Sequence, residues 1–397
     1  MLSHICSRIC NNWTILKNTF MNRRILIAAD IHTHPVLGGN QQCIMQYVKV
    51  LRKLGFEVYF LYIDLSEGNF FNKETQAYWG DHLFYYATPK WQTILQKVRR
   101  RIEHCYYSPH LDVYYPYGLT SFVNCLHEEY HFHGLIVNYV WNSRLSECNI
   151  PIKCIYTHDV FTNRNEKLGV KDAWYSYPQS EEAKGIARFA HVLSIQEEES
   201  EWFRKIAPQS EVHTVYSSFD FVEQPITCNK NILFFSGGGA LNKAGIDRFI
   251  TEVLPMLIKQ DNDIRLLLGG GICSCYKQED LDSHIILKGR YENPDDFYVL
   301  GDICINPVFN GSGLKIKTFE ALAHGKVTIV DPHSALGVYQ PNNIPLHRAL
   351  SASDYLTTII KYIQNKELLL KKRQVCKSYI NDYNNYIIGV YRSVFFR

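Results

Sequence analysis

Short apolar runs alternate along the chain with longer stretches in which apolar residues recur every three or four positions. Over residues 24–64, an apolar run, a loop with two glycines, a helical repeat and a second apolar run follow one another. This succession predicts a βαβ unit. Later apolar runs of the same kind follow at 135–140, 154–156 and 192–195. The first half of the chain therefore predicts a parallel, doubly wound sheet.

The pattern starts again after the polar stretch 223–230, which we interpret as an interdomain linker. A helix is predicted over 244–257, because apolar residues there recur at helical spacing. Five strands are predicted in this half, at 231–236, 264–270, 284–289, 302–307 and 326–330. Beyond Asp354 the pattern is helical, and its apolar end at 386–396 is interpreted either as a cap on the second sheet or as a helix that returns to the first domain.

Length and composition fit a globular protein of two domains. The chain has 397 residues, of which 46% are hydrophobic and 20% are charged, and a single core rarely serves more than about 300 residues. Its twelve cysteines are scattered through apolar segments, which predicts reduced thiols in a cytoplasmic protein. Cys273 and Cys275 have no second Cys or His pair at ligand spacing, so we expect no metal site.

Charge limits the partners. The formal net charge of +3 is too small to indicate nucleic-acid binding, and no nucleic-acid signature occurs. A basic run at 97–101 follows the aromatic residues Tyr85, Tyr86 and Trp91. Basic side chains beside aromatic ones are typical of a surface for an anionic membrane or a phosphate-bearing acceptor, and equally of a solvated helix face.

No run of 18 apolar residues occurs, so the sequence predicts no membrane-spanning segment. Residues 1–20 lack the continuous apolar core of a signal peptide. Met21 opens directly into the first predicted strand. We therefore expect residues 1–20 to be an extension outside the fold, or alternatively a short amphipathic anchor.

The most informative motif is PVFNGSGLKIKTFEALAHGKVTIV at residues 307–330. Gly311 and Gly313 let a phosphate approach the backbone, and the N–H groups at the start of the following helix face it with the positive end of the dipole. Glu320 lies about 10 Å further along the helix, at about 1.5 Å per residue, where a carboxylate can accept hydrogen bonds from a ribose. An ordinary helix that covers a sheet is the alternative interpretation.

The form G-S-G-x-K-x-K-x-x-E-A-L-A-x-G-K closely matches one branch of the GT-B glycosyltransferases, and the chain resembles their retaining family 4 and relatives in bacterial polysaccharide and lipopolysaccharide synthesis. The resemblance implies an α/β GT-B fold, with two doubly wound, Rossmann-like domains facing a central cleft and a C-terminal helix that crosses back. We accordingly expect an acceptor-side domain at 21–224, a nucleotide-sugar-binding domain at 225–375 and a returning helix at 376–397.

The resemblance also assigns roles to residues at the carboxyl ends of the strands, where open α/β sheets bind ligands. His158 and Asp159 stand where the family places groups that contact the reacting sugar, and they are the expected catalytic residues. The residues expected to bind the donor nucleotide are Gly38, Gly39, Lys243, Gly311, Ser312, Gly313, Leu314, Lys315, Lys317 and Glu320. The residues expected on the acceptor side are Arg164, Gln196 and Glu197.

Two positions depart from the family pattern. Ser312 stands where the commoner motif has a first glutamate, and the glycines at 237–239 stand where an arginine is usual. Either Lys243 and Lys315 together neutralise the leaving diphosphate, or the glycine-rich loop binds it through its N–H groups.

The expected activity is transfer, with retention of configuration, of a sugar from a nucleotide-diphosphate sugar to a saccharide acceptor, lipid-linked as in O-antigen or capsule synthesis. We expect no metal and no other cofactor, because lysines and helix dipoles can stabilise the leaving group. The expected location is the cytoplasm, with peripheral contact to an anionic membrane. Two alternatives stay open: a non-catalytic GT-B subunit that binds nucleotide or saccharide, and a nucleotide-sugar 2-epimerase.

Overall fold

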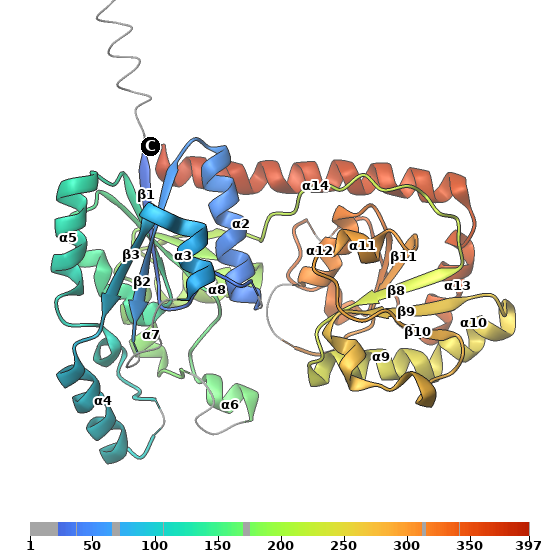
Figure 1. Ribbon diagram of the computed structural model, residues 1–397, viewed down its shortest axis with the longest axis horizontal. Coiled ribbons are helices and arrows are strands. Elements are labelled where there is room, and N and C mark those ends of the chain that lie inside the picture. Colours follow the sequence, from blue (N-terminus) through green and yellow to red (C-terminus); the bar gives the residue numbers. More distant parts are fainter. Residues whose placement is uncertain are drawn as a thin grey trace, which may run out of the picture. The chain divides into compact units, whose positions relative to one another are not determined.

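The computed structural model describes residues 23–36, 38–65, 72–105, 107–169, 175–311, 315–340 and 342–396. It divides into two compact units (Figure 1). Unit 1 comprises Met1–Val215 and Ile388–Arg397, and unit 2 comprises Tyr216–Ile387. The expected extension at 1–20 and the donor candidates Ser312, Gly313 and Leu314 lie outside the described residues.

The change of unit comes before the stretch that we interpreted as a linker. Residues 223–230 lie in unit 2, where they are tied to the sheet. The backbone N–H groups of Thr227 and Cys228 donate to the buried carboxylate of Asp302, the latter at 2.7 Å. This polar stretch is therefore packed structure rather than a free connection.

Unit 1 contains a seven-stranded parallel sheet in the order β3-β2-β1-β4-β5-β6-β7. Its strands are β1 (Arg24–Ala29), β2 (Glu57–Asp64), β3 (Leu83–Ala87), β4 (Gly134–Asn138), β5 (Ile152–Tyr156), β6 (His191–Ser194) and β7 (Glu211–Thr214). Its helices are α2 (Gly39–Lys53), α3 (Lys73–Trp79), α4 (Lys90–Ile102), α5 (Leu119–Tyr130), α6 (Arg164–Leu168), α7 (Gln179–Ile186) and α8 (Glu197–Ile206). The sequence pattern missed the edge strands β3 and β7, because β3 is partly exposed along its whole length and β7 carries polar residues.

Unit 2 contains a six-stranded parallel sheet in the order β10-β9-β8-β11-β12-β13. Its strands are β8 (Asn231–Phe235), β9 (Arg265–Gly269), β10 (Ile285–Leu287), β11 (Ile303–Asn306), β12 (Val327–Val330) and β13 (Leu346–Arg348). Its helices are α9 (Ala240–Glu252), α10 (Leu254–Gln260), α11 (Asp295–Tyr298), α12 (Ile316–Ala323), α13 (Ala352–Tyr362) and most of α14 (Lys366–Phe395).

Two predictions for this unit were wrong. The helix predicted at 244–257 is two helices, because Pro255 has no N–H for the carbonyl of Thr251 and its ring opposes continuation. The prediction of five strands missed β13, which has only three residues and is partly exposed. The other apolar runs of the motif region became β11 and β12 as expected.

Helices cover both faces of the unit 2 sheet because alternate strand residues point to opposite sides. Ile232 and Phe234 belong to a core with residues of α9, α10 and α13, whereas Leu233 packs with Phe297 and Ala321 of α11 and α12. Figure 1 shows α9 and α10 on one side of the strands and α11 and α12 on the other. The near-continuous apolar strands are the expected signature of a sheet that is buried on both faces.

The strand order reverses beside the first strand of each unit. In unit 1 the chain proceeds from β1 through β2 to β3 and then returns to β4 on the other side of β1, and in unit 2 it returns likewise from β10 to β11. Loops at such a reversal diverge and leave a crevice at the carboxyl ends of the strands. The fold thus places one candidate site at β1/β4 and another at β8/β11.

The end of α14 packs on unit 1. Phe395 is fully buried, its carbonyl lies 2.7 Å from Nε2 of His133, and its ring contacts that of Phe56. A Cβ at Gly134 would lie 2.6 Å from the Phe395 ring, so only a glycine leaves room for this side chain. The crossing helix implied by the family resemblance is therefore present.

The packing of Phe395 can be tested by unfolding unit 1 alone. All six tryptophans lie between residues 13 and 202, so intrinsic fluorescence in a urea titration reports that unit. Phe395→Ala should lower its free energy of unfolding by about 3 kcal/mol, because a buried ring leaves a cavity. The neighbouring Phe396 is 45% exposed. Phe396→Ala should therefore lower the free energy of unfolding by about 1 kcal/mol or less. Equal effects of the two substitutions would contradict this packing.

Candidate functional site

A cavity of about 340 Å³ opens at the β8/β11 crevice of unit 2. The residues that line it come from the start of α9, the loop after β11, the start of α12 and the turn after β12: Leu241, Asn242, Asn306, Val308, Asn310, Gly311, Lys315, Ile316, Lys317, His333 and Ser334. Its size is that of a small-molecule site. Three of the predicted donor residues, Gly311, Lys315 and Lys317, are thus brought together.

Two lysines give the cavity its positive charge. Nζ of Lys317 donates to Oδ1 of Asn242 at 2.9 Å, and Nζ of Lys315 lies 3.4 Å from the carbonyl oxygen of Gly311 and 3.4 Å from Nε2 of His333. Burial lowers the pKa of Lys317 to about 8; the carboxylate of Glu320 opposes this effect, and the charge of Lys315 adds to it. An anion in the cavity would offset that cost of burial.

A buried side-chain oxygen without a partner and an unusual glycine lie in the wall of the cavity. Oδ1 of Asn306, a residue only 4% exposed, has no hydrogen-bond partner, while its amide nitrogen donates to Thr318. Gly311 has φ +126°, which a residue with a side chain rarely adopts. A buried acceptor without a partner is costly.

Glu320 lies on α12, but it is not among the residues that line this cavity. Its carboxylate accepts a hydrogen bond from the hydroxyl of Tyr298, and burial together with this carboxylate raises the pKa of Tyr298. On the same helix Ile316 lines the cavity, whereas Phe319 and Ala323 are buried.

Lys243 and the glycine loop after β8 do not line the cavity. Nζ of Lys243 forms an ion pair with Asp247 at 2.6 Å and lies over the ring of Tyr276. A Cβ at Gly238 would lie 2.9 Å from the carbonyl oxygen of Gly271, so this glycine is required by packing. In this structure the charge at the cavity comes from Lys315 and Lys317.

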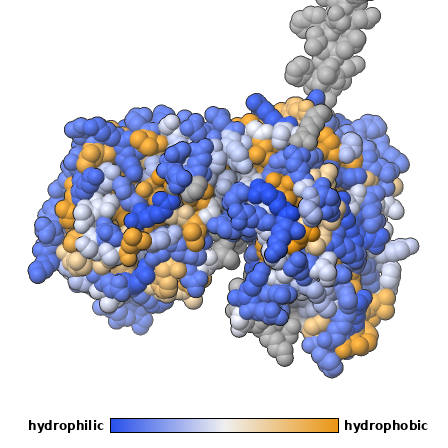
Figure 2. Space-filling model, turned by 180° about the vertical axis from the view of Figure 1, so that it is seen from behind, coloured by the Kyte–Doolittle hydropathy of each residue, from blue (hydrophilic) through white to orange (hydrophobic). Residues whose placement is uncertain are grey.

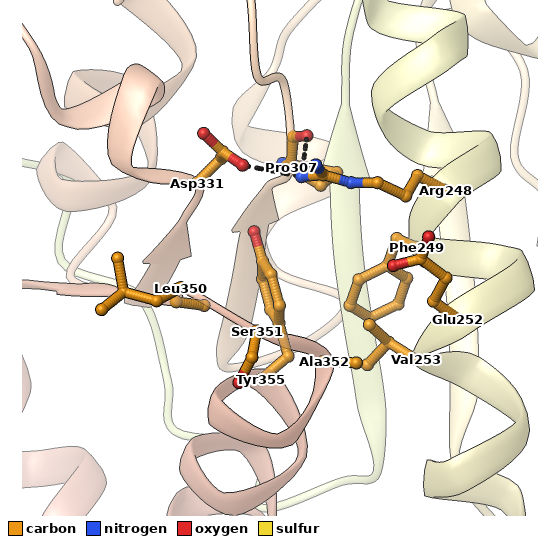
Figure 3. Close-up of a pocket in the computed structure, with 11 residues that line it drawn as sticks. Arg248, Phe249, Glu252, Val253, Pro307, Asp331, Leu350, Ser351, Ala352 and Tyr355 are labelled. Carbon is orange, nitrogen blue, oxygen red and sulfur yellow. Dashed lines mark hydrogen bonds and ion pairs between the residues drawn. The ribbon is translucent and has the colours of Figure 1, made fainter.

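A second, much smaller cavity of about 80 Å³ lies between α9 and the start of α13. Figure 3 shows Arg248 reaching Asp331 and the carbonyl of Pro307 above Tyr355. The Arg248–Asp331 ion pair is 2.6 Å long. Ligand sites usually exceed about 300 Å³, so this closed ion pair is structural.

In unit 1, His158 follows β5 and is held by a buried amide. Its Nε2 lies 2.9 Å from Oδ1 of Asn138, whose own amide group donates to the carbonyl of Ala28. Burial lowers the pKa of His158 to about 3, so its ring is neutral at pH 7. The ring therefore donates from Nε2 and keeps a lone pair on Nδ1 that can accept a hydrogen bond.

Asp159 is directed elsewhere. Oδ1 accepts from the N–H of Val160 at 2.8 Å, and Oδ2 forms an ion pair with Arg164. These contacts fix the turn that leads to α6, and Asn138 rather than Asp159 orients His158. Two of the predicted site residues, Asp159 and Arg164, are thus paired with each other.

The remaining predicted residues of unit 1 lie at helix starts. Gly38 precedes α2, and its N–H donates to Oε1 of Gln41 at 2.8 Å, while Gly39 begins the helix. Gln196 precedes α8 and donates to Glu199. Glu197 accepts from Thr214 and forms an ion pair with Arg204.

The sequence analysis missed a cavity of about 470 Å³ in unit 1. It lies where β1 and β2 end beside α4, and its lining is Asp30, Tyr62, Leu65, Thr93, Gln96, Lys97, Arg100, Tyr107, Tyr114 and Tyr175. Aromatic faces, one carboxyl and two cations suit a saccharide with an anionic group. Asp30 directly follows the first strand, so strand-end position alone could have flagged it; nothing in the sequence groups the distant tyrosines.

Asp30 has two strong donors in the β1/β4 crevice. Nε1 of Trp141 and Nδ2 of Asn142 each donate to it at 3.2 Å. Burial raises its pKa to about 6, although both hydrogen bonds oppose the rise. A carboxyl that ionises near neutral pH at a cavity wall is typical of functional sites.

One group within the described ranges has the geometry of metal ligands: His191, Glu211 and His213. Oε2 of Glu211 lies 3.4 Å from Nδ1 of His191, and Oε1 lies 3.6 Å from Nε2 of His213. These residues stand near the amino ends of β6 and β7, opposite the edge that carries the cavities. They are not part of the candidate donor site.

Part of the chain matches a known protein family. Residues 229–353 match the model of the glycosyl transferases group 1. No curated protein matches the chain.

The chain is also similar to solved structures over most of its length. These include TarM (11% identity, TM-score 0.62, covering 94% of this chain and 99% of that one) and Anabaena HepE in complex with UDP and glucose (12%, TM-score 0.58, 94% and 99%). Another is the pneumococcal O-GlcNAc transferase GtfA in complex with UDP and GlcNAc (10%, TM-score 0.58, 94% and 98%).

The family match covers the β8/β11 cavity and the residues that line it, and the structural likeness extends to both units. Residues 229–353 therefore match the glycosyl transferases group 1, and the chain as a whole has the GT-B fold.

Proposed function

We propose that the chain transfers a sugar from a nucleotide-diphosphate sugar, with UDP as the leaving group, to a saccharide acceptor with retention of configuration. The β8/β11 cavity carries this proposal, because it brings the cations of Lys315 and Lys317 together beside the backbone of Gly311. The solved structures of HepE and GtfA contain UDP, which supports this choice of nucleotide.

Within this proposal the two lysines bind the diphosphate, and no metal is needed for its departure. Their charge stabilises the negative charge that grows on the leaving oxygen. Glu320 holds the ribose hydroxyls after releasing Tyr298, its present partner.

Unit 1 binds the acceptor in its tyrosine-lined cavity. Asp30 accepts a saccharide hydroxyl, and Lys97 and Arg100 bind a phosphate next to the sugar, which indicates a lipid-linked acceptor. His158 offers its Nδ1 lone pair to the reacting saccharide. The work is done in the cytoplasm at an anionic membrane, and the ten cysteines of the described residues, all free thiols, fit that compartment.

Calorimetry with UDP, in parallel with GDP, CDP and TDP, tests the donor. Glu320→Ala should weaken UDP binding by about 1.5 to 3 kcal/mol, because charge-assisted ribose hydrogen bonds are lost. Tyr298→Phe is the control: it removes the hydroxyl that holds Glu320 and should leave the affinity equal or slightly higher. Unchanged affinity in a folded Glu320→Ala variant would refute the ribose assignment.

The pH dependence of UDP affinity tests Lys317. Its pKa is lowered to about 8 in the free protein, so the cation that meets the phosphate is lost as the pH rises through that value. Affinity should be nearly constant from pH 7 to 8 and then fall by up to about tenfold per pH unit. Lys317→Arg should flatten this profile, because guanidinium stays charged. A profile that is the same in both proteins would exclude Lys317 as the phosphate ligand.

Steady-state kinetics separate His158 from donor binding. His158→Ala should lower kcat by about 10- to 100-fold, the value of one buried hydrogen bond in the transition state, with little change in UDP affinity. Arg164→Gln, which acts on the neighbouring Asp159 turn, provides a control for local structure. A defect of His158→Ala confined to UDP affinity would contradict its role at the saccharide.

A further inference from the structure

Helix α4 turns its apolar face outward. Trp91, Ile94, Leu95, Val98 and Ile102 are 53%, 56%, 59%, 47% and 72% exposed. At 3.6 residues per turn these five side chains share an arc of about 100°. Figure 2 shows apolar side chains gathered at the lower right, over the place of α4. We call these five residues the α4 apolar face.

The opposite face of α4 is polar and attaches the helix to unit 1. Thr93 and Gln96 are buried, and Nε2 of Gln96 donates to the carbonyl of Val113 at 2.8 Å. Gln92 donates to the carbonyl of Tyr115 at 2.6 Å and accepts from the N–H of Tyr117 at 2.7 Å. A helix at the surface of a globular protein normally buries its apolar face and exposes its polar face. The exposed α4 apolar face therefore indicates a binding surface.

Basic residues border the α4 apolar face on both sides. At 100° per residue, Arg99 lies next to one edge of the arc, and Lys90 and Arg101 lie next to the other. All three are exposed, and the helix itself contains no acidic residue, although Glu103 directly after it forms an ion pair with Arg99 at 2.6 Å. Beyond the arc, the 70% exposed ring of Tyr117 packs against Trp91 with ring centroids 5.7 Å apart.

This combination decides among the possible occupants. A second copy of the chain would place two sets of basic residues against each other around a shared apolar seam, which is unfavourable. An anionic lipid surface accepts both features, because apolar side chains enter the acyl boundary while lysine and arginine reach the phosphates. Among the helices of the described residues, none has the length and apolar content to cross a bilayer.

We propose that the α4 apolar face and its basic border dock the protein on an anionic lipid bilayer. This inference rests on the proposed lipid-linked acceptor and extends it. The same helix supplies Lys97 and Arg100 to the tyrosine-lined cavity. Docking through the outer face therefore holds that cavity at the membrane surface, where the phosphate of a lipid-linked saccharide lies.

Vesicle flotation tests the proposal with the full chain. Vesicles of phosphatidylglycerol in phosphatidylcholine should bind the wild-type protein, and binding should weaken at high salt, whereas pure phosphatidylcholine should bind it at least tenfold more weakly. The double substitution Ile94→Glu, Leu95→Glu should lower binding to anionic vesicles at least tenfold. The double substitution Leu370→Glu, Val375→Glu, at 37% and 51% exposed positions on α14, introduces the same charge elsewhere and should bind as wild type.

Trp91 provides a second readout, because its own ring belongs to the α4 apolar face. Brominated acyl chains should quench part of the protein's tryptophan fluorescence, and Trp91→Phe should remove that quenched part. Circular dichroism and UDP calorimetry on each variant show that its fold and donor site persist. If the double glutamate variant unfolds, the uncharged variant Ile94→Gln, Leu95→Gln is used in its place.

The outcomes separate this inference from the proposed function. Equal binding of the wild type and the α4 variants to anionic vesicles, no binding of the wild type, or equal binding to neutral vesicles would overturn the docking surface. Self-association that the α4 substitutions abolish would assign the face to a second copy instead. Vesicle binding without UDP binding would leave the docking surface standing and refute the donor proposal.

Discussion

All strands of each unit run parallel, so every strand ends at the same edge of its sheet, and the strand order reverses beside the first strand. The loops that leave β8 and β11 must therefore diverge, and the same holds for β1 and β4. The two larger cavities open at this carboxyl edge, one beside β8 and β11 and the other beside β1 and β2. The small ion-paired cavity at Arg248 lies farther along the unit 2 sheet.

The two cavities are built of groups that are costly to leave without a ligand. In unit 2 the burial that lowers the pKa of Lys317 to about 8 also leaves Oδ1 of Asn306 without a donor. In unit 1 the burial of Asp30 raises its pKa to about 6 beside four tyrosines. A diphosphate in the first cavity would offset the burial of the Lys317 cation, and a saccharide hydroxyl in the second would pair with Asp30, which is why we assign donor and acceptor in this way.

The fold was predictable because a sheet buried on both faces requires apolar runs, and most of the strands could be read from them. Short or half-polar edge strands such as β7 and β13 leave no such signal. The sequence motif placed Lys315 and Lys317 close together, and both line the β8/β11 cavity, but it could not show that Lys243 pairs with Asp247 one turn along its own helix.

The tyrosine-lined cavity of unit 1 could not be predicted from the sequence, because its tyrosines lie far apart in the chain and meet only in the fold. The outward orientation of the α4 apolar face could not be predicted from the sequence either. Its helical repeat was read as a basic run after aromatic residues, and only the exposed fractions reveal that the apolar side faces outward. Periodicity predicts a helix, but the side that faces the core depends on contacts such as that of Gln96 with Val113.

Hydrogen exchange of the full chain with and without saturating UDP tests the central claim, that the β8/β11 cavity of unit 2 is the donor site. The account predicts that UDP slows amide exchange at the start of α9, in the loop after β11 and at the start of α12, while the amides around Arg248 and Tyr355 remain unchanged. Protection confined to the Arg248 cavity, or bound UDP that protects no amide of unit 2, would contradict it.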